Sequence, residues 1–204
     1  DTTGTTSFTP TNDSIYEGNE TAIIQINTVS GGNASESGTQ SKTITITEDD
    51  STPVITLTAG TTVAEPATSG ASASTVTLTA TASIAADEAI TVTIDPSGSS
   101  TGTEGTDYTI PATITIAANA TTGTGVLTPI HDTLFENSET AIIEITGVSG
   151  GSANEHGTAQ SKTITITDKA LNSGTQNTYD ASTASSLLSN NAFTNSGFND
   201  NSSS

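Results

Sequence analysis

The sequence predicts an all-β protein built from Greek-key β-sandwich domains. Short runs of alternating apolar and polar residues, rich in Thr, Ile and Val, recur along residues 1–168, and Gly, Pro, Asn, Asp and Ser separate them. No stretch keeps a helical period over a useful length. An internal repeat has a period of about 119 residues, which is the size of one β-sandwich domain. Together these observations favour tandem sandwich repeats.

The internal repeat sets the expected domain organisation. Residues 2–47 align with residues 121–167 at an offset of 119, which becomes 120 after the inserted Ala159, and about 30 aligned positions are identical. The chain is therefore expected to start within a repeat. The expected parts are residues 1–50, the C-terminal half of a sandwich completed by an upstream segment or a partner chain; residues 51–168, a complete sandwich; and residues 169–204, a Ser- and Asn-rich tail or docking segment.

The expected strands of the complete unit share strict alternation, which buries one face of each strand and leaves the other in water. They are residues 54–58, 75–79, 90–94, 113–116, 141–145 and 163–166. Pro66, Pro96 and Pro111 are expected at strand ends or edges, and Gly150 with Gly151 opens a long loop between the last two strands. About seven strands in about 118 residues fit a sandwich with an Ile, Val, Leu and Ala core.

Residues 1–50 supply only about three strands. Three strands with an apolar face need cover to remain soluble. The cover comes either from an upstream segment or from another chain that adds strands to the sandwich. Of these two, we favour a longer array of repeats.

The charge balance restricts the partners. There are 22 acidic residues against three cationic ones, so the formal net charge is −19. Nucleic acid and anionic membranes attract basic surfaces, so neither is expected as a partner. Inorganic cations or basic partners are favoured instead. No cysteine is present to identify the redox compartment, and no apolar run approaches the ~18 residues of a membrane span.

An acidic turn before a run of Ile occurs in both copies of the repeat. Residues 129–140 read PIHDTLFENSET, and residues 10–21 read PTNDSIYEGNET. Carboxylates grouped in one turn are either a cation site or a solvated loop. Glu139 opens the following strand and is expected to be structural, accepting backbone N–H bonds.

Residues 51–168 resemble the Calx-beta domain in the order of their motifs. The run GTEGTDYT (residues 102–109) is followed by a strand, a short turn and the acidic turn. The resemblance covers residues 51–168 fully and residues 1–50 as half a domain. It implies an immunoglobulin-like sandwich of a family found in sodium–calcium exchangers, in integrin beta chains and in tandem in large bacterial surface and secreted proteins. Some members of the family bind calcium.

The resemblance also implies which residues would hold Ca²⁺. In the complete unit they are Glu65, Asp107, Asp132, Glu136 and Asp168, and in the half unit Asp13, Glu17, Glu48 and Asp49. With Asp50, the last two form an acidic run at the junction of the units. After the complete unit the counterpart of that run contains Lys169. The junction of Glu48, Asp49 and Asp50 is therefore the favoured calcium site.

The expected function is that of an extracellular or cell-surface structural and adhesive repeat protein, stiffened by calcium. Copies could polymerise head to tail into a filament by strand complementation, or bind other surface or matrix proteins. The alternative is a calcium-dependent adhesin module that recognises a glycan or a protein. An enzyme is not expected, because no nucleophile elbow, phosphate loop or zinc motif is evident. Tyr179, Phe193 and Phe198 make the C-terminal tail a candidate docking segment.

Overall fold

The computed structural model describes residues 3–132 and 136–168, and every regular element in them is a β-strand. The predicted all-β class is therefore confirmed. The expectations for residues 169–204, including the three tail aromatics, lie outside the described residues. Within the described ranges no helix could cross a membrane.

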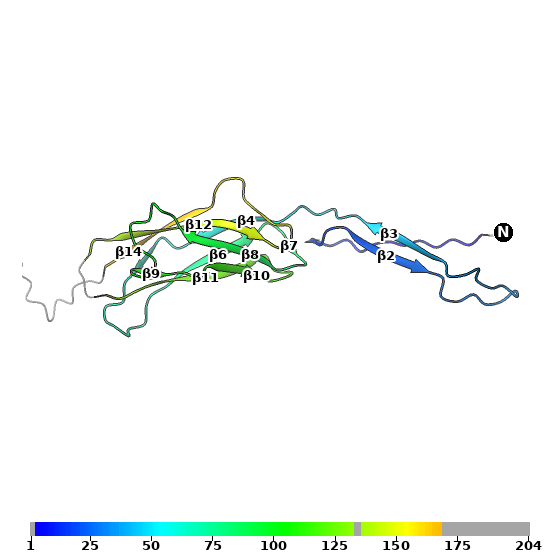
Figure 1. The fold of residues 1–204 in the computed structure, drawn as a ribbon, viewed down its shortest axis with the longest axis horizontal. Coiled ribbons are helices and arrows are strands. Elements are labelled where there is room, and N and C mark those ends of the chain that lie inside the picture. The colour runs from blue at the N-terminus through cyan, green and yellow to red at the C-terminus, as the bar shows by residue number, and fades with distance from the viewer. Residues whose placement is uncertain (1–2, 133–135, 169–204) are drawn as a thin grey trace, which may run out of the picture. The chain divides into compact units, whose positions relative to one another are not determined.

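The sandwich segment, which is the name used below for residues 51–168, contains most of the strands (Figure 1). All six runs predicted from alternation overlap a strand. The strands are β4 (Val54–Ala59), β5 (Thr62–Ala64), β6 (Val76–Ala82), β7 (Ala85–Ala86), β8 (Ile90–Pro96), β9 (Tyr108–Thr109), β10 (Thr113–Ile116), β11 (Thr122–Pro129), β12 (Glu139–Ser149), β13 (Asn154–Glu155) and β14 (Ser161–Thr167).

Two five-stranded sheets form the sandwich. Their strand orders are β10-β8-β12-β14-β5 and β13-β4-β6-β11-β9. Most neighbours are antiparallel, whereas the pairs β14–β5 and β13–β4 are parallel. Strands that follow one another in sequence often lie in different sheets, so the chain crosses repeatedly between the layers and produces the predicted sandwich.

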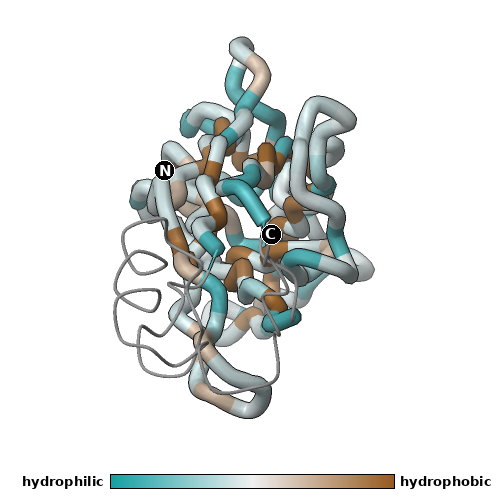
Figure 2. Tube along the Cα trace, turned by 90° about the vertical axis from the view of Figure 1, so that its left-hand side faces the viewer, coloured by the Kyte–Doolittle hydropathy of each residue, from teal (hydrophilic) through white to brown (hydrophobic). Residues whose placement is uncertain are grey.

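The core lies between the sheets and follows the period-2 pattern of the sequence. Along β6, buried residues alternate with exposed or half-buried threonines. In Figure 2 the hydrophobic positions gather toward the interior, and many hydrophilic positions lie in the surrounding loops. Burying each large aliphatic side chain stabilises the fold by roughly 1.5–3 kcal/mol. The largest fully buried side chains are Tyr108, Ile55, Leu57, Leu78, Ile90, Ile94, Ile114, Ile116, Leu127, Ile143, Ile164 and Ile166.

Strand β11 begins with Thr-Gly-Thr-Gly, and alternation of apolar residues did not single it out. Gly123 and Gly125 are buried, because β10 and its flanking loop come close to them. A Cβ on Gly123 would overlap the carbonyl oxygen of Thr115, and one on Gly125 would lie 2.8 Å from the Pro111 ring. The glycines therefore take the inward positions that apolar side chains occupy in other strands.

The N-terminal segment means residues 1–50, and its described part, residues 3–50, has three short strands, which are β1 (Ile15–Tyr16), β2 (Glu20–Gln25) and β3 (Ser41–Ile46). Strands β2 and β3 form an antiparallel pair. Strand β1 pairs in parallel with β7, and the carbonyl of Tyr16 accepts a hydrogen bond from the N–H of Asp87 at 3.1 Å. The acidic turn of the first copy thus lies within a hydrogen-bonded loop.

Candidate cation site

The loop before β9 holds Asp107 in a fixed conformation. Its carboxylate accepts a hydrogen bond from the N–H of Thr103 at 2.6 Å, and its own N–H donates to the Thr103 carbonyl at 2.9 Å. Its carbonyl accepts from Ile130 at 2.9 Å, which ties this loop to the start of the acidic turn. The next residue, Tyr108, is fully buried and anchors the loop in the core. Asp107 itself is only 7% exposed.

Asp107, Glu136 and Glu139 form a carboxylate cluster. One oxygen from each lies within 4.8 Å of the others. Glu136 and Glu139 both come from the acidic turn, where Glu139 is also the first residue of β12, and Asp107 comes from the loop before β9, so two parts of the chain that are distant in sequence meet here. Three carboxylates this close repel one another strongly unless a proton or a cation intervenes.

Glu139 is the most perturbed member of this cluster. Burial, followed by the charge of Asp107 and a hydrogen bond with it, raises the pKa of Glu139 from 4.5 to about 7, and the charges of Glu136 and Glu65 add to the rise. Its Oε2 atom is buried and has no hydrogen-bond partner. A buried carboxylate oxygen without a partner is costly, and a cation would remove that cost.

Asp168 and Glu65 border the cluster. The Oδ2 atom of Asp168 accepts a hydrogen bond from the N–H of Glu136 at 2.9 Å, while its Oδ1 atom is buried without a hydrogen-bond partner. Glu65 is 9% exposed, and its N–H donates to the carbonyl of Thr167 at 3.0 Å, beside Asp168. Both residues lie outside the group whose oxygens are within 4.8 Å of one another.

Asp132 is half-buried and also lies outside that group. Its neighbour His131 has its Nδ1 atom 2.9 Å from the carbonyl oxygen of Pro66. This contact links the acidic turn to the loop that carries Glu65. Of the five ligands that the resemblance implies for the complete unit, the structure places Asp107 and Glu136 together, with Asp168 hydrogen-bonded to the Glu136 backbone.

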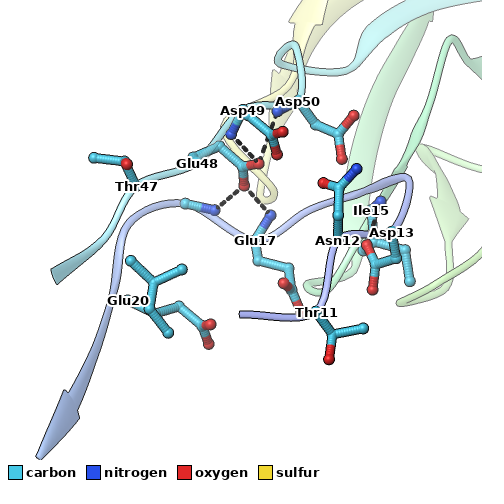
Figure 3. Close-up of a pocket in the computed structure, with 12 residues that line it drawn as sticks. Thr11, Asn12, Asp13, Ile15, Glu17, Glu20, Thr47, Glu48, Asp49 and Asp50 are labelled. Carbon is cyan, nitrogen blue, oxygen red and sulfur yellow. Dashed lines mark hydrogen bonds between the residues drawn. The ribbon is translucent and has the colours of Figure 1, made fainter. Parts of the chain in front are cut away.

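A second acidic group lies at the end of the N-terminal segment (Figure 3). Oxygens of Glu48, Asp49 and Asp50 come within 4.8 Å of one another. Asp13 and Glu17 line the same small pocket but are exposed and lie outside the group. The Oδ1 atom of Asp13 accepts a hydrogen bond from the N–H of Ile15 at 2.9 Å.

Glu48 already serves as an acceptor for the backbone. Its Oε2 atom accepts from the N–H groups of Glu17 and Gly18, both at 2.6 Å, and its Oε1 atom accepts from Asp49 at 3.0 Å and Asp50 at 2.9 Å. The hydrogen bonds from Asp50 and Glu17 are the largest causes that lower the pKa of Glu48. Burial, together with the charges of Asp49 and Glu48, raises the pKa of Asp50. The junction is thus a hydrogen-bonded loop as well as an acidic group.

The position of Glu139 at a strand start predicts a structural carboxylate that accepts backbone N–H bonds, whereas the structure places this carboxylate with Asp107 and Glu136. Its position as the first residue of a strand is as expected. The missed signal was alternation. Glu139 shares the parity of Ala141, Ile143 and Ile145, which are all buried, so its side chain belongs to the inner face.

No family model and no curated protein matches the sequence. Among solved structures, the apo-form Calx CBD1 domain is similar at a TM-score of 0.44 and 14% identity, over 57% of this chain and 99% of that one. CBD12 from CALX1.2 has the same TM-score and identity, over 57% and 44%. A two-domain protein of unknown function from Bacteroides fragilis NCTC 9343 has a TM-score of 0.42 and 13% identity, over 57% and 46%.

Two of these similar structures are Calx domains, and the sequence motifs resemble the Calx-beta domain. At these TM-scores and identities the likeness carries no inference about binding.

Proposed function

We propose that the sandwich segment is a calcium-binding β-sandwich module. The observation that carries the proposal is the meeting of Asp107, Glu136 and Glu139, whose oxygens lie within 4.8 Å of one another. Ca²⁺ takes six to eight oxygen ligands at ~2.3–2.6 Å, so two ligands of one ion lie no more than about 5 Å apart. The cluster meets this limit.

The ligand chemistry also fits calcium. The three converging side chains Asp107, Glu136 and Glu139 are all carboxylates, and hard oxygen ligands suit Ca²⁺ rather than softer transition metals. The buried Oε2 atom of Glu139 and the buried Oδ1 atom of Asp168 supply oxygens without hydrogen-bond partners. Glu65 and Asp132 are further ligand candidates from the bordering loops. The ion would neutralise a cluster that otherwise holds a proton near neutral pH.

We propose a second, weaker cation site at Glu48, Asp49 and Asp50. Both carboxylate oxygens of Glu48 accept hydrogen bonds from backbone N–H groups, so Asp49 and Asp50 would supply most of the ligand oxygens. Asp13 and Glu17 line the same pocket. A cation here would screen the repulsion among the carboxylates and stiffen the loop that precedes β4.

At the level of the whole protein we propose an extracellular structural or adhesive role, with calcium stiffening each repeat. Support comes from the internal repeat, the Thr-rich two-layer sheets and the acidic composition. Calcium is abundant enough outside cells to fill sites of only modest affinity.

Calorimetric titration of chelator-stripped protein with Ca²⁺ tests the proposal, with Mg²⁺ as the comparison ion. We expect Ca²⁺ to bind and to raise the melting temperature, because an ion that binds only the folded state stabilises it. Mg²⁺ should bind more weakly, since it demands compact octahedral geometry. Identical melting temperatures in calcium and in chelator would sink the proposal.

A further inference from the structure

The same strand pair occurs twice in this chain in two different environments. In β2–β3, Ala22 lies opposite Ile44, and in β12–β14, Ala141 lies opposite Ile164. The two pairs agree in register along their whole common length, and their sequences are nearly identical. A period of two therefore places equivalent residues on the equivalent face.

That face is covered in one copy and open in the other. Ile143 and Ile145 are 0% and 7% exposed, whereas their counterparts Ile24 and Ile26 are 40% and 49% exposed. The residue types are the same, so the difference lies in what packs against the strands. An open apolar face of this kind marks an interaction surface.

A third stretch of the N-terminal segment shows the same contrast. Residues 2–9 match residues 121–128, which include most of β11. The described part of this stretch forms no strand, and Phe8 is 43% exposed where its counterpart Leu127 is fully buried. Strand β11 pairs with β6 and β9, and no counterparts of these two strands occur in residues 3–50.

The sandwich segment itself shows which strands provide the cover. Strand β8 pairs with β12, and β10 pairs with β8. The facing sheet contributes Leu57 from β4 and Leu78 from β6 to the same core as Ile143. The covering set is therefore residues 54–116, which lie between the two copies of the repeat.

We propose that the open face of the N-terminal segment is a docking surface for strands with the chemistry of residues 54–116, supplied by a preceding repeat. These strands would pair with β2 and with residues 3–9, and they would bury Phe8, Ile24 and Ile26. Main-chain pairing would add to apolar burial, as in other cases of strand addition.

Counting the strands argues against a second copy of this chain as the donor of residues 54–116. Each chain carries one set of residues 54–116 but two stretches able to receive it, residues 2–47 and 121–167. A copy that donated its set to a neighbour would expose its own β12 and β14. The exchange would bury no additional apolar surface in total, so it lacks a driving force.

The test is a chain extended by a second copy of residues 51–119 placed directly before Asp1. The alignment puts Asp1 in register with Ala120, so this extension supplies the set in its natural phase. We expect amide hydrogen exchange in β2 and β3 to slow at least about tenfold relative to the unextended chain. The matched control carries Leu57→Asp and Leu78→Asp in the added copy alone, and it should show no slowing.

Equal exchange in the extended chain and in its control would overturn the proposal. Sedimentation of the unextended chain over a concentration series provides a second measurement. A dimer with protected β2 and β3 amides would show that a second copy covers the face, and it would also overturn the proposal. In the unextended chain, Ile24→Ser with Ile26→Ser should leave the melting temperature of the sandwich unchanged, whereas a drop would mean that the face is already covered.

Discussion

Asp168 accepts a hydrogen bond from the backbone N–H of Glu136 at 2.9 Å. The equivalent position in the first copy is Glu48, which accepts from the N–H of Glu17 at 2.6 Å. One acidic residue after the last strand thus holds the acidic turn in both copies. The longer Glu48 side chain also reaches the N–H of Gly18.

Asp168→Ala should destabilise the calcium-free protein. It removes the hydrogen bond that the half-buried N–H of Glu136 donates, and a bond of this kind contributes about 0.5–1.5 kcal/mol. Urea unfolding in chelator measures the loss. Asp168→Glu is the matched control, since Glu48 makes the same bond from the equivalent position, and it should retain most of the stability. Equal losses in the two variants would contradict a role for this hydrogen bond.

Asp107→Asn and Glu139→Gln should each weaken calcium binding by at least about tenfold, because calcium affinity depends on the number of charged ligands. Glu144→Gln is the control. It removes one charge from the same strand, but Glu144 lies on the opposite face from Glu139. Calorimetric titration gives the three affinities. A similar loss in Glu144→Gln would point to general charge screening rather than to a site.

The stability of the calcium-free protein should depend on pH because of the raised pKa of Glu139. Its pKa is about 7 in the folded protein against an ordinary value of 4.5, so the folded state holds this proton more tightly than the unfolded state. The contribution of the protonated Glu139 carboxyl to the free energy of unfolding is fully present below pH 4.5 and is lost as the pH rises through about 7. In chelator, Glu139→Gln should therefore stabilise the protein more at pH 8 than at pH 5. A constant difference between wild type and variant across this range would contradict the shift.

The sandwich fold could be predicted from the sequence because alternation and the repeat report directly on burial. Runs such as residues 90–94 show which face is inside without any knowledge of their neighbours. Strand β11 was not singled out, since its inward positions are Gly123 and Gly125. Glycine is needed at these positions because β10 and its flanking loop lie close to them. This closeness is a property of the packed structure and not of the local sequence.

The candidate site was predictable only in part. The acidic turn and the Asp-Tyr loop indicated Asp107 and Glu136, and the structure brings these two together. The place of Glu139 at a strand start predicts a structural role and does not indicate it as a ligand. Which loops approach one another depends on the order of strands across two sheets, and local sequence does not determine that order.

Gly123→Ala should destabilise the sandwich, since the added methyl group would overlap the Thr115 carbonyl oxygen, which is backbone and yields little. Overpacking of this kind costs typically ~1–3 kcal/mol. Gly157→Ala is the control, because a Cβ there meets nothing within 4 Å. Denaturant unfolding compares the two variants. A neutral Gly123→Ala would show that β10 and β11 can separate without loss.

Two equivalent isoleucines should respond differently to the same truncation. Ile143→Ala removes a fully buried side chain from the core and should cost about 2–5 kcal/mol. Ile24→Ala removes its counterpart in the first copy, which is 40% exposed, and should change the stability of the sandwich by less than about 0.5 kcal/mol. Thermal or urea unfolding of the two variants measures both values. A large loss from Ile24→Ala would mean that the N-terminal segment has its cover already, and the contrast between the two copies would then need another cause.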